Sequence, residues 1–202
     1  MNVRSFVAAA LLAPAITLAA PKPSSSQPAP ASQSGVPGLE LGGFIGYETD
    51  DFSGLALRFD AEMPIQQLNP QVKLSVVGSI GYSYLTWDTY GVTVKSNLFK
   101  IVPAARFTIP VAPQVDVFGD VGLGLAHASV SVDVPPYGTF SDSSTNLMMR
   151  FGVGGWFHVN PKLKLGAMFD LDPVFGDYAT SNGGYSKSET FWSILFGAMF
   201  QL

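Results

Sequence analysis

The pattern that most constrains this chain is an alternation of apolar and polar side chains with a period of two residues, which recurs from Leu39 to Leu202. A period of two belongs to β-strands, because successive side chains of a strand point to opposite faces. Two segments, 39–49 and 94–108, alternate weakly. The segments that alternate clearly are 55–63, 72–84, 115–125, 147–157, 163–171 and 192–202. The sequence therefore predicts eight strands, an even number that suits an antiparallel barrel.

The length and the apolar faces of these segments favour a barrel that crosses a membrane. A strand of about 11 residues, rising about 3.3 Å per residue and tilted near 40°, spans roughly 27 Å, the apolar height of a transmembrane barrel. A soluble barrel also alternates, but its apolar face points inward. Here the apolar face of the clear segments carries no Lys or Arg, and the polar face is rich in Gly and Ser. We therefore expect the apolar face to meet lipid.

The ends of the predicted strands agree with this arrangement. If the first strand starts on the inner side of the membrane, aromatic residues gather at both edges of the apolar band, as in known transmembrane barrels. The outer set is Tyr47, Tyr82, Tyr84 and Trp192, and the inner set is Phe107, Phe157 and Phe200. The predicted inner connections are the short segments 64–70, 109–113 and 160–162. The outer connections include two long polar loops, 131–145 and 172–188.

The N-terminal residues 1–19 predict a secretory signal peptide, because Arg4 precedes an apolar run that ends in small residues. Pro14 interrupts this run, which is already shorter than the ~20 residues that a spanning helix needs. Residues 20–38 are rich in Pro and Ser and show no periodicity, which predicts a solvated linker. The barrel is therefore assigned to residues 39–202.

The composition excludes several classes of protein. The 202 residues are 47% hydrophobic and 13% charged, which is too apolar for a disordered chain. The absence of Cys excludes a disulfide framework, and with two His residues no transition-metal site or cofactor is expected. The net charge of −4 argues against a nucleic-acid partner, because no excess of basic residues is available to neutralise phosphates.

The charged residues of the strands fall on the polar face, with six of each sign. The basic set is Arg58, Lys73, Lys100, Arg106, Arg150 and Lys164, and the acidic set is Glu40, Asp60, Glu62, Asp116, Asp120 and Asp170. This balance predicts an ion-pair network in the lumen, since an unpaired charge in so narrow a space is costly. The same phase also carries large side chains: Phe44, Phe118, Met148, Trp156, Met168, Phe191 and Leu195. We therefore expect a plugged lumen, with a narrow small-solute channel as the alternative.

These features together resemble a known family. An export signal, eight alternating segments and a final strand that ends in Phe200, Gln201 and Leu202 are similar to the small eight-stranded outer-membrane β-barrels of Gram-negative bacteria, the OmpA/OmpX type. Members of that family commonly end in Phe, whereas this chain ends in Leu with Phe two residues earlier. The resemblance covers residues 39–202. It implies an all-β, antiparallel, up-and-down transmembrane barrel in the cell outer membrane.

One pair of residues suggests an enzyme. His127 and Ser129 lie two apart, on the lipid-facing phase at the outer end of the fifth predicted strand, and Asp133 follows on the same phase. Outer-membrane lipid A deacylases resemble this arrangement. A His beside a Ser can act as a general base for attack on an ester, provided that an acid orients the His. The flanking residues do not reproduce the fuller deacylase pattern, so the alternative is a polar pair where the strand enters the loop.

We expect this barrel to have a structural or surface-interaction role rather than an enzymatic one. Its external loops, 131–145 and 172–188, are the expected contact surface for a surface or host partner. Outer-membrane lipid and lipopolysaccharide are the expected surroundings. A lipid-modifying enzyme that uses His127 and Ser129 is the main alternative.

Overall fold

The structure is a computed structural model that describes residues 38–50, 52–89, 92–134, 137–179 and 185–202. The predicted signal peptide, 1–19, and all of the predicted linker except Gly38 lie outside the described residues. Within the described residues, no helix has the length and apolar character needed to cross a membrane.

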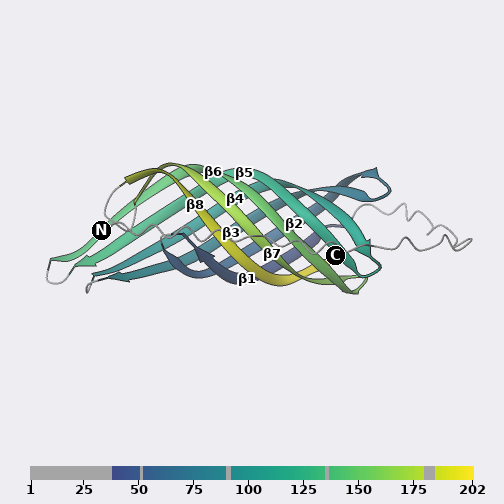
Figure 1. The fold of residues 1–202 in the computed structure, drawn as a ribbon, viewed down its shortest axis with the longest axis horizontal. Helices are drawn as coiled ribbons and strands as arrows, with labels where there is room; N and C mark the ends of the chain where they lie inside the picture. Colours follow the sequence, from purple (N-terminus) through teal and green to yellow (C-terminus); the bar gives the residue numbers. More distant parts are fainter. Residues whose placement is uncertain (1–37, 51, 90–91, 135–136, 180–184) are drawn as a thin grey trace, which may run out of the picture. The chain divides into compact units, whose positions relative to one another are not determined.

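Eight antiparallel strands close into one barrel, in which each strand pairs with its neighbours in sequence and the last pairs with the first (Figure 1). The strands are β1 (Glu40–Thr49), β2 (Ser53–Asn69), β3 (Val72–Thr89), β4 (Val92–Ala112), β5 (Val115–Val134), β6 (Gly138–Asn160), β7 (Leu163–Ala179) and β8 (Tyr185–Gln201). The predicted up-and-down topology is confirmed. We call the end of the barrel that holds Glu40 and Gln201 the terminal end and the opposite end the far end.

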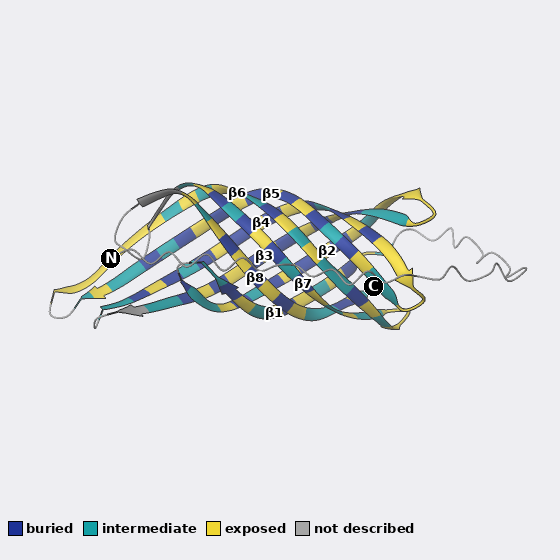
Figure 2. Ribbon diagram, viewed as in Figure 1, coloured by how far each residue is buried: buried dark blue, intermediate teal, exposed yellow. Residues whose placement is uncertain are grey.

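Burial alternates along the strands and produces the chequered pattern in Figure 2. The exposed phase is apolar: Val121 and Leu123 on β5 are 48% and 55% exposed. The buried phase faces the lumen, where Val102 on β4 is fully buried. The side chains of the two predicted aromatic sets are all exposed, and the strand pairing places them toward the two ends of the barrel. The apolar face therefore lies outside and the polar face inside.

The predicted connections need correction at both ends. The segment 131–145 is mostly strand, because β5 extends to Val134 and β6 starts at Gly138, with pairing such as Ser131 with Ser141. The segment 172–188 is likewise covered in large part by the ends of β7 and β8. At the terminal end, most of 64–70 belongs to β2, with register shifts after Pro64 and Gln67. Apolar alternation ends where the lipid ends, whereas backbone pairing continues into water, so the sequence pattern underestimated the strands.

Candidate functional site

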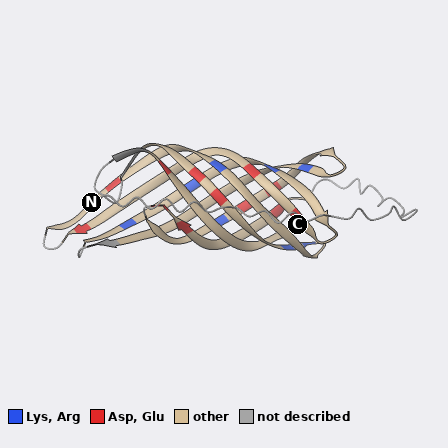
Figure 3. Cartoon of the chain, viewed as in Figure 1, with Lys and Arg blue, Asp and Glu red and all other residues tan. Residues whose placement is uncertain are grey.

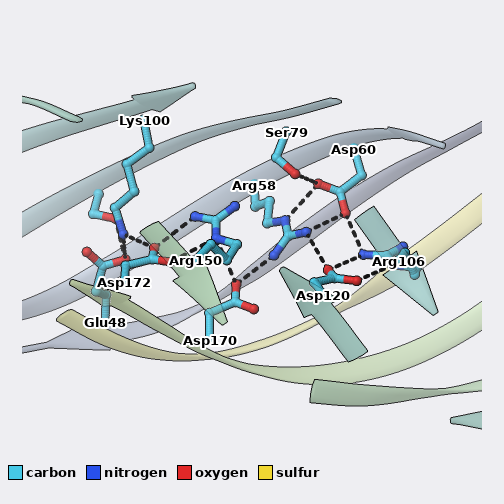
Figure 4. Close-up of polar contacts among 11 residues, drawn as sticks. Glu48, Arg58, Asp60, Ser79, Lys100, Arg106, Asp120, Arg150, Asp170 and Asp172 are labelled. Atoms are coloured by element: carbon cyan, nitrogen blue, oxygen red, sulfur yellow. Dashed lines mark hydrogen bonds and ion pairs between the residues drawn. The ribbon is translucent and has the colours of Figure 1, made fainter. Parts of the chain in front are cut away.

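Two arginines and three aspartates form the centre of the lumen (Figure 4). Arg58 donates from Nε and Nη2 to the two carboxylate oxygens of Asp60, at 2.7 and 2.8 Å, and from Nη1 to Asp170 Oδ2 at 2.6 Å. Arg106 donates from Nε and Nη2 to the two carboxylate oxygens of Asp120, both at 2.7 Å. Each arginine also reaches the aspartate that the other holds: Arg58 contacts Asp120 at 3.2 Å, and Arg106 contacts Asp60 at 3.1 Å. We call these five residues the central cluster.

The central cluster joins side chains of β2, β4, β5 and β7 across the lumen. The β4–β5 register sets Arg106 directly opposite Asp120, which explains their two-point contact. Arg58 and Asp60 lie two residues apart on β2, and therefore on one face. Ser79 on β3 donates its hydroxyl to Asp60 Oδ1 at 2.8 Å.

A second ionic group lies toward the far end. Asp172 on β7 receives Lys100 Nζ at 2.8 Å and two nitrogens of Arg150, both at 2.8 Å. Lys100 also contacts Glu48 Oε2 at 2.7 Å. Glu48 and Asp172 are two members of the network that the sequence pattern does not predict. Glu48 lies on a weakly alternating strand, and Asp172 falls at the start of a predicted loop, although its spacing of two from Asp170 places both on one strand face.

The terminal end carries looser pairs. Lys164 Nζ contacts both carboxylate oxygens of Glu40, at 2.9 and 2.7 Å, while Lys73 is 33% exposed and lies 3.7 and 3.9 Å from Glu40 and Glu62. Glu62 also accepts from Arg106 Nη1 at 2.8 Å. Asp116 pairs with a residue outside the predicted network, because its Oδ2 lies 2.7 Å from His158 Nε2. The structure thus gives eleven of the twelve predicted lumen residues an oppositely charged partner, while Asp116 contacts the ring of His158, and Figure 3 shows how the charges lie along the barrel.

Apolar side chains fill the lumen beside these charges. An aromatic group at the central cluster stacks Phe118 on Trp156 at 5.1 Å between ring centroids, and the guanidinium of Arg106 lies 4.4 Å from the Phe118 ring centre. Glycines make room for it: a Cβ on Gly154 would collide with the Phe118 ring, and one on Gly166 would collide with the Trp156 ring. A second group includes Phe52 from the β1–β2 connection, which is 2% exposed. Its other buried members are Leu85, Val94, Leu98, Val102, Ala126, Ala128, Val130, Met148, Val174 and Phe191.

The lumen is consequently a packed interior in which the charged groups pair with one another. A buried ion pair that is well hydrogen-bonded offsets its own desolvation cost and leaves few groups for a ligand. The described residues contain no group of three His, Asp or Glu side chains arranged to hold a metal ion.

On the outer face of β4, β5 and β6, residues that pair across the three strands form rows, and these rows change from apolar to polar toward the far end. Ile101, Leu125 and Leu147 form an exposed apolar row. Beyond that row, side chains with hydroxyl, amide or charged groups prevail. The next rows are Phe99, His127 and Thr145, then Asn97, Ser129 and Ser143, then Lys95, Ser131 and Ser141, and finally Thr93, Asp133 and Thr139. We call the last three rows the polar wall.

A family comparison matches this architecture. A family model described as "Outer membrane protein beta-barrel domain" matches residues 8–200. The chain belongs to this family of outer-membrane β-barrels. The prediction of the family, of the fold and of the outer membrane as its location is therefore confirmed. No curated protein is significantly similar in sequence to the chain.

Solved structures of outer-membrane barrels share the fold of this family member. A major outer membrane protein from Thermus thermophilus matches with a TM-score of 0.56 and 16% identity, over 81% of this chain and 99% of that one. Neisserial surface protein A matches with a TM-score of 0.52 and 13% identity, over 81% and 96%. The outer membrane enzyme PagL matches with a TM-score of 0.47 and 14% identity, over 81% and 99%, a likeness too weak to support an enzymatic role.

The candidate catalytic residues lie where this barrel passes from the apolar rows to the polar wall. His127 is exposed, and its Nδ1 lies 2.8 Å from the hydroxyl oxygen of Thr145, its cross-strand neighbour. Among the described residues, no hydrogen bond joins His127 to Ser129 or to Asp133. Ser129 instead lies opposite Ser143 and Asn97. The structure therefore brings His127 together with Thr145 and not with Ser129 or Asp133.

Proposed function

We propose that this outer-membrane barrel is a surface-interaction protein whose far end is the contact surface and whose lumen serves as a closed scaffold. The observation that carries the proposal is the contrast between a lumen packed with paired charges and an outer face that becomes a polar wall beyond the apolar band. The central cluster is buried and hydrogen-bonded to itself, which supports a structural interior. The polar wall offers exposed groups for binding.

The orientation in the membrane supports the far end as the outer one. Transmembrane barrels of bacteria have short turns on the periplasmic side and longer connections outside. The three hairpins at the terminal end connect their strands through two residues each, at 70–71, 113–114 and 161–162. At the far end, β5 and β6 extend beyond the apolar row of Leu125 and Leu147. We therefore assign 131–145 and the far-end part of 172–188 to the cell surface, above outer-membrane lipid and lipopolysaccharide, whereas Asp172 itself lies in the lumen.

The test compares the full chain with a variant whose β5–β6 hairpin is shortened by replacing 131–141 with a two-residue turn, which joins the cross-strand partners Val130 and Asp142. Bacteria that express each protein are measured for adherence to glass coated with fibronectin, laminin, collagen or purified lipopolysaccharide. The full chain should increase adherence to at least one coating, and the shortened variant should lose that increase while keeping its folded migration on a gel. The proposal is contradicted if cells that express the full chain adhere no better than cells that express the shortened variant. It is also contradicted if they adhere no better than cells without the protein. A defined single-channel conductance of the full chain in planar bilayers contradicts it as well.

A further inference from the structure

A pocket lies at the terminal end of the barrel, the end that the short turns assign to the periplasm. Its volume is about 230 Å³, and it is lined by the β2–β3 turn and by residues of β3, β4 and β5. Lys73 lies opposite Thr108 in the β3–β4 register, and Pro110 lies opposite Asp116 in the β4–β5 register. Three neighbouring strands therefore place these four lining residues together at the mouth of the lumen.

The contacts of Lys73 with carboxylates are long. Its ammonium lies 3.7 Å from Glu40 and 3.9 Å from Glu62, beyond hydrogen-bond distance. Each of these carboxylates has a closer base, because Lys164 lies 2.7 Å from Glu40 and Arg106 lies 2.8 Å from Glu62. The ammonium of Lys73, which is partly exposed, is therefore available to an anionic group that enters the pocket.

Asp116 limits the negative charge that the pocket accepts. This residue lines the pocket, and its Oδ2 lies 2.7 Å from His158 Nε2. A sulfate or phosphate ion would bring several negatively charged oxygens close to the carboxylate of Asp116, and like charges repel. A single carboxylate brings less charge and can accept a charge-assisted hydrogen bond from Lys73. The charges of the pocket therefore favour a monoanion.

The remaining walls of the pocket are apolar surfaces and carboxamides. Pro70, Val72 and Pro110 provide the apolar surfaces, and Gln67 and Gln71 provide the carboxamides. A carboxamide carries both donors and an acceptor, so it can pair with a peptide group. The volume lies below the roughly 300–1,000 Å³ that is typical of sites for drug-sized ligands. The pocket therefore suits one or two small residues of a peptide.

We propose that this pocket binds the carboxyl-terminal end of another polypeptide on the periplasmic side. The terminal carboxylate lies at Lys73, small apolar side chains pack against Pro70 and Pro110, and Asp116 excludes ligands with more than one negative charge. Capture of a terminal carboxylate is a recurring mode of peptide recognition. The site lies at the opposite end of the barrel from the proposed contact surface and adds a second binding function to it.

The test uses the isotope-labelled full chain in lipid nanodiscs, which leave both ends of the barrel accessible. The probe is a peptide with the sequence Gly-Ser-Gly-Ala-Ala and a free terminal carboxylate, and the control is the same peptide with a terminal amide. Nuclear magnetic resonance should show shifts of the backbone signals of Lys73 and Thr108 with the free peptide. The amide should bind at least about tenfold more weakly, because a hydrogen bond to a charged group is lost. Equal binding of the two peptides, or binding of neither, overturns the inference.

Variants locate the site and keep it testable if one of them does not fold. Lys73→Met should keep its folded gel migration and bind the free peptide about tenfold more weakly, whereas Lys73→Arg should retain binding. The matched control is Lys162→Met, because Lys162 is an exposed base in the β6–β7 turn at the same end and does not line the pocket. Normal binding by a folded Lys73→Met variant overturns the inference. If Lys73→Met does not fold, the comparison of free and amidated peptide decides.

Competition with inorganic sulfate tests the role of Asp116. Sulfate should displace the free peptide from Asp116→Asn at a concentration several-fold lower than from the full chain, because the repelling carboxylate is gone. Equal displacement from the two proteins contradicts the selection of monoanions by Asp116. Adherence through the far end should be the same for the full chain and Lys73→Met, so failure of peptide binding leaves the proposed function standing.

Discussion

The central cluster and the β5–β6 hairpin share strand β5, yet the polar groups of the two regions have opposite surroundings. In the lumen, Arg106 is fully buried and each of its nitrogens has a carboxylate partner. On the hairpin, Ser141 and Ser143 are exposed. Inside a lipid-embedded barrel an unpaired polar group is costly, whereas water satisfies it above the membrane. The difference separates a part that holds the fold from a part whose polar groups face water.

The largest expected effect comes from removing one charged partner from the central cluster, which tests whether the buried charges stabilise the fold. Arg106→Met should lower the free energy of unfolding by about 3–5 kcal/mol, because the buried carboxylates of Glu62 and Asp120 then lose their main partner and Asp60 loses its second one. Urea unfolding in lipid vesicles, followed by Trp fluorescence, measures the change. The matched control is Lys95→Met on the same strand, which is exposed and should change stability by less than about 0.5 kcal/mol. Similar effects of the two substitutions would contradict a structural role for the cluster.

The next largest expected effect is the loss of stability when a charge is placed on the lipid-facing apolar side of β5. Val121→Lys places a charge on the lipid-facing side of β5 and should cost about 2–4 kcal/mol if the residue lies at the bilayer centre. Ser131→Lys is on the same face of the same strand, beyond the apolar rows, and should cost at most about 1 kcal/mol. The same unfolding measurement compares them. A cost for Ser131→Lys as large as that for Val121→Lys would show that the hairpin is embedded in lipid.

The packed aromatic part of the lumen predicts a smaller effect. Gly166→Ala brings a methyl group into the Trp156 ring and the backbone oxygen of Gly155, so it should destabilise the barrel by about 1–3 kcal/mol. Gly78→Ala is the control, because a Cβ there meets nothing within 4 Å. Thermal unfolding followed by gel migration should separate the two variants. Equal melting temperatures would mean that the aromatic group has room to shift.

The smallest expected effect belongs to the candidate catalytic pair. Ser129→Ala removes a hydroxyl from the polar wall and should leave both stability and lipid A unchanged, because His127 contacts Thr145 rather than Ser129. Mass spectrometry of lipid A from cells that express each protein measures the acyl chains. Loss of a deacylated species in the variant alone would support an enzyme and contradict a purely interacting surface.

The alternation of apolar and polar residues was enough to predict the fold. It also predicted which charged residues face the lumen, because a period of two assigns every side chain of a strand to one of two faces. Residues such as Arg58 and Asp170 were therefore expected in the lumen before their partners were known. The sequence did not indicate which carboxylate each base would meet. Glu48 and Asp172 were missed because they lie near strand ends, where the apolar alternation that marks a strand is weak.

The sequence by itself determined that this chain is a barrel with its apolar face toward lipid, since the alternation and the charge-free apolar phase allow no other placement of so much apolar surface. Tertiary structure decided the rest. Closure of the barrel brings Arg58 to Asp170, residues 112 positions apart, into contact. Pairing of β8 with β1 sets the last strand beside the first. Both depend on strand register and closure, which join residues that no local pattern relates.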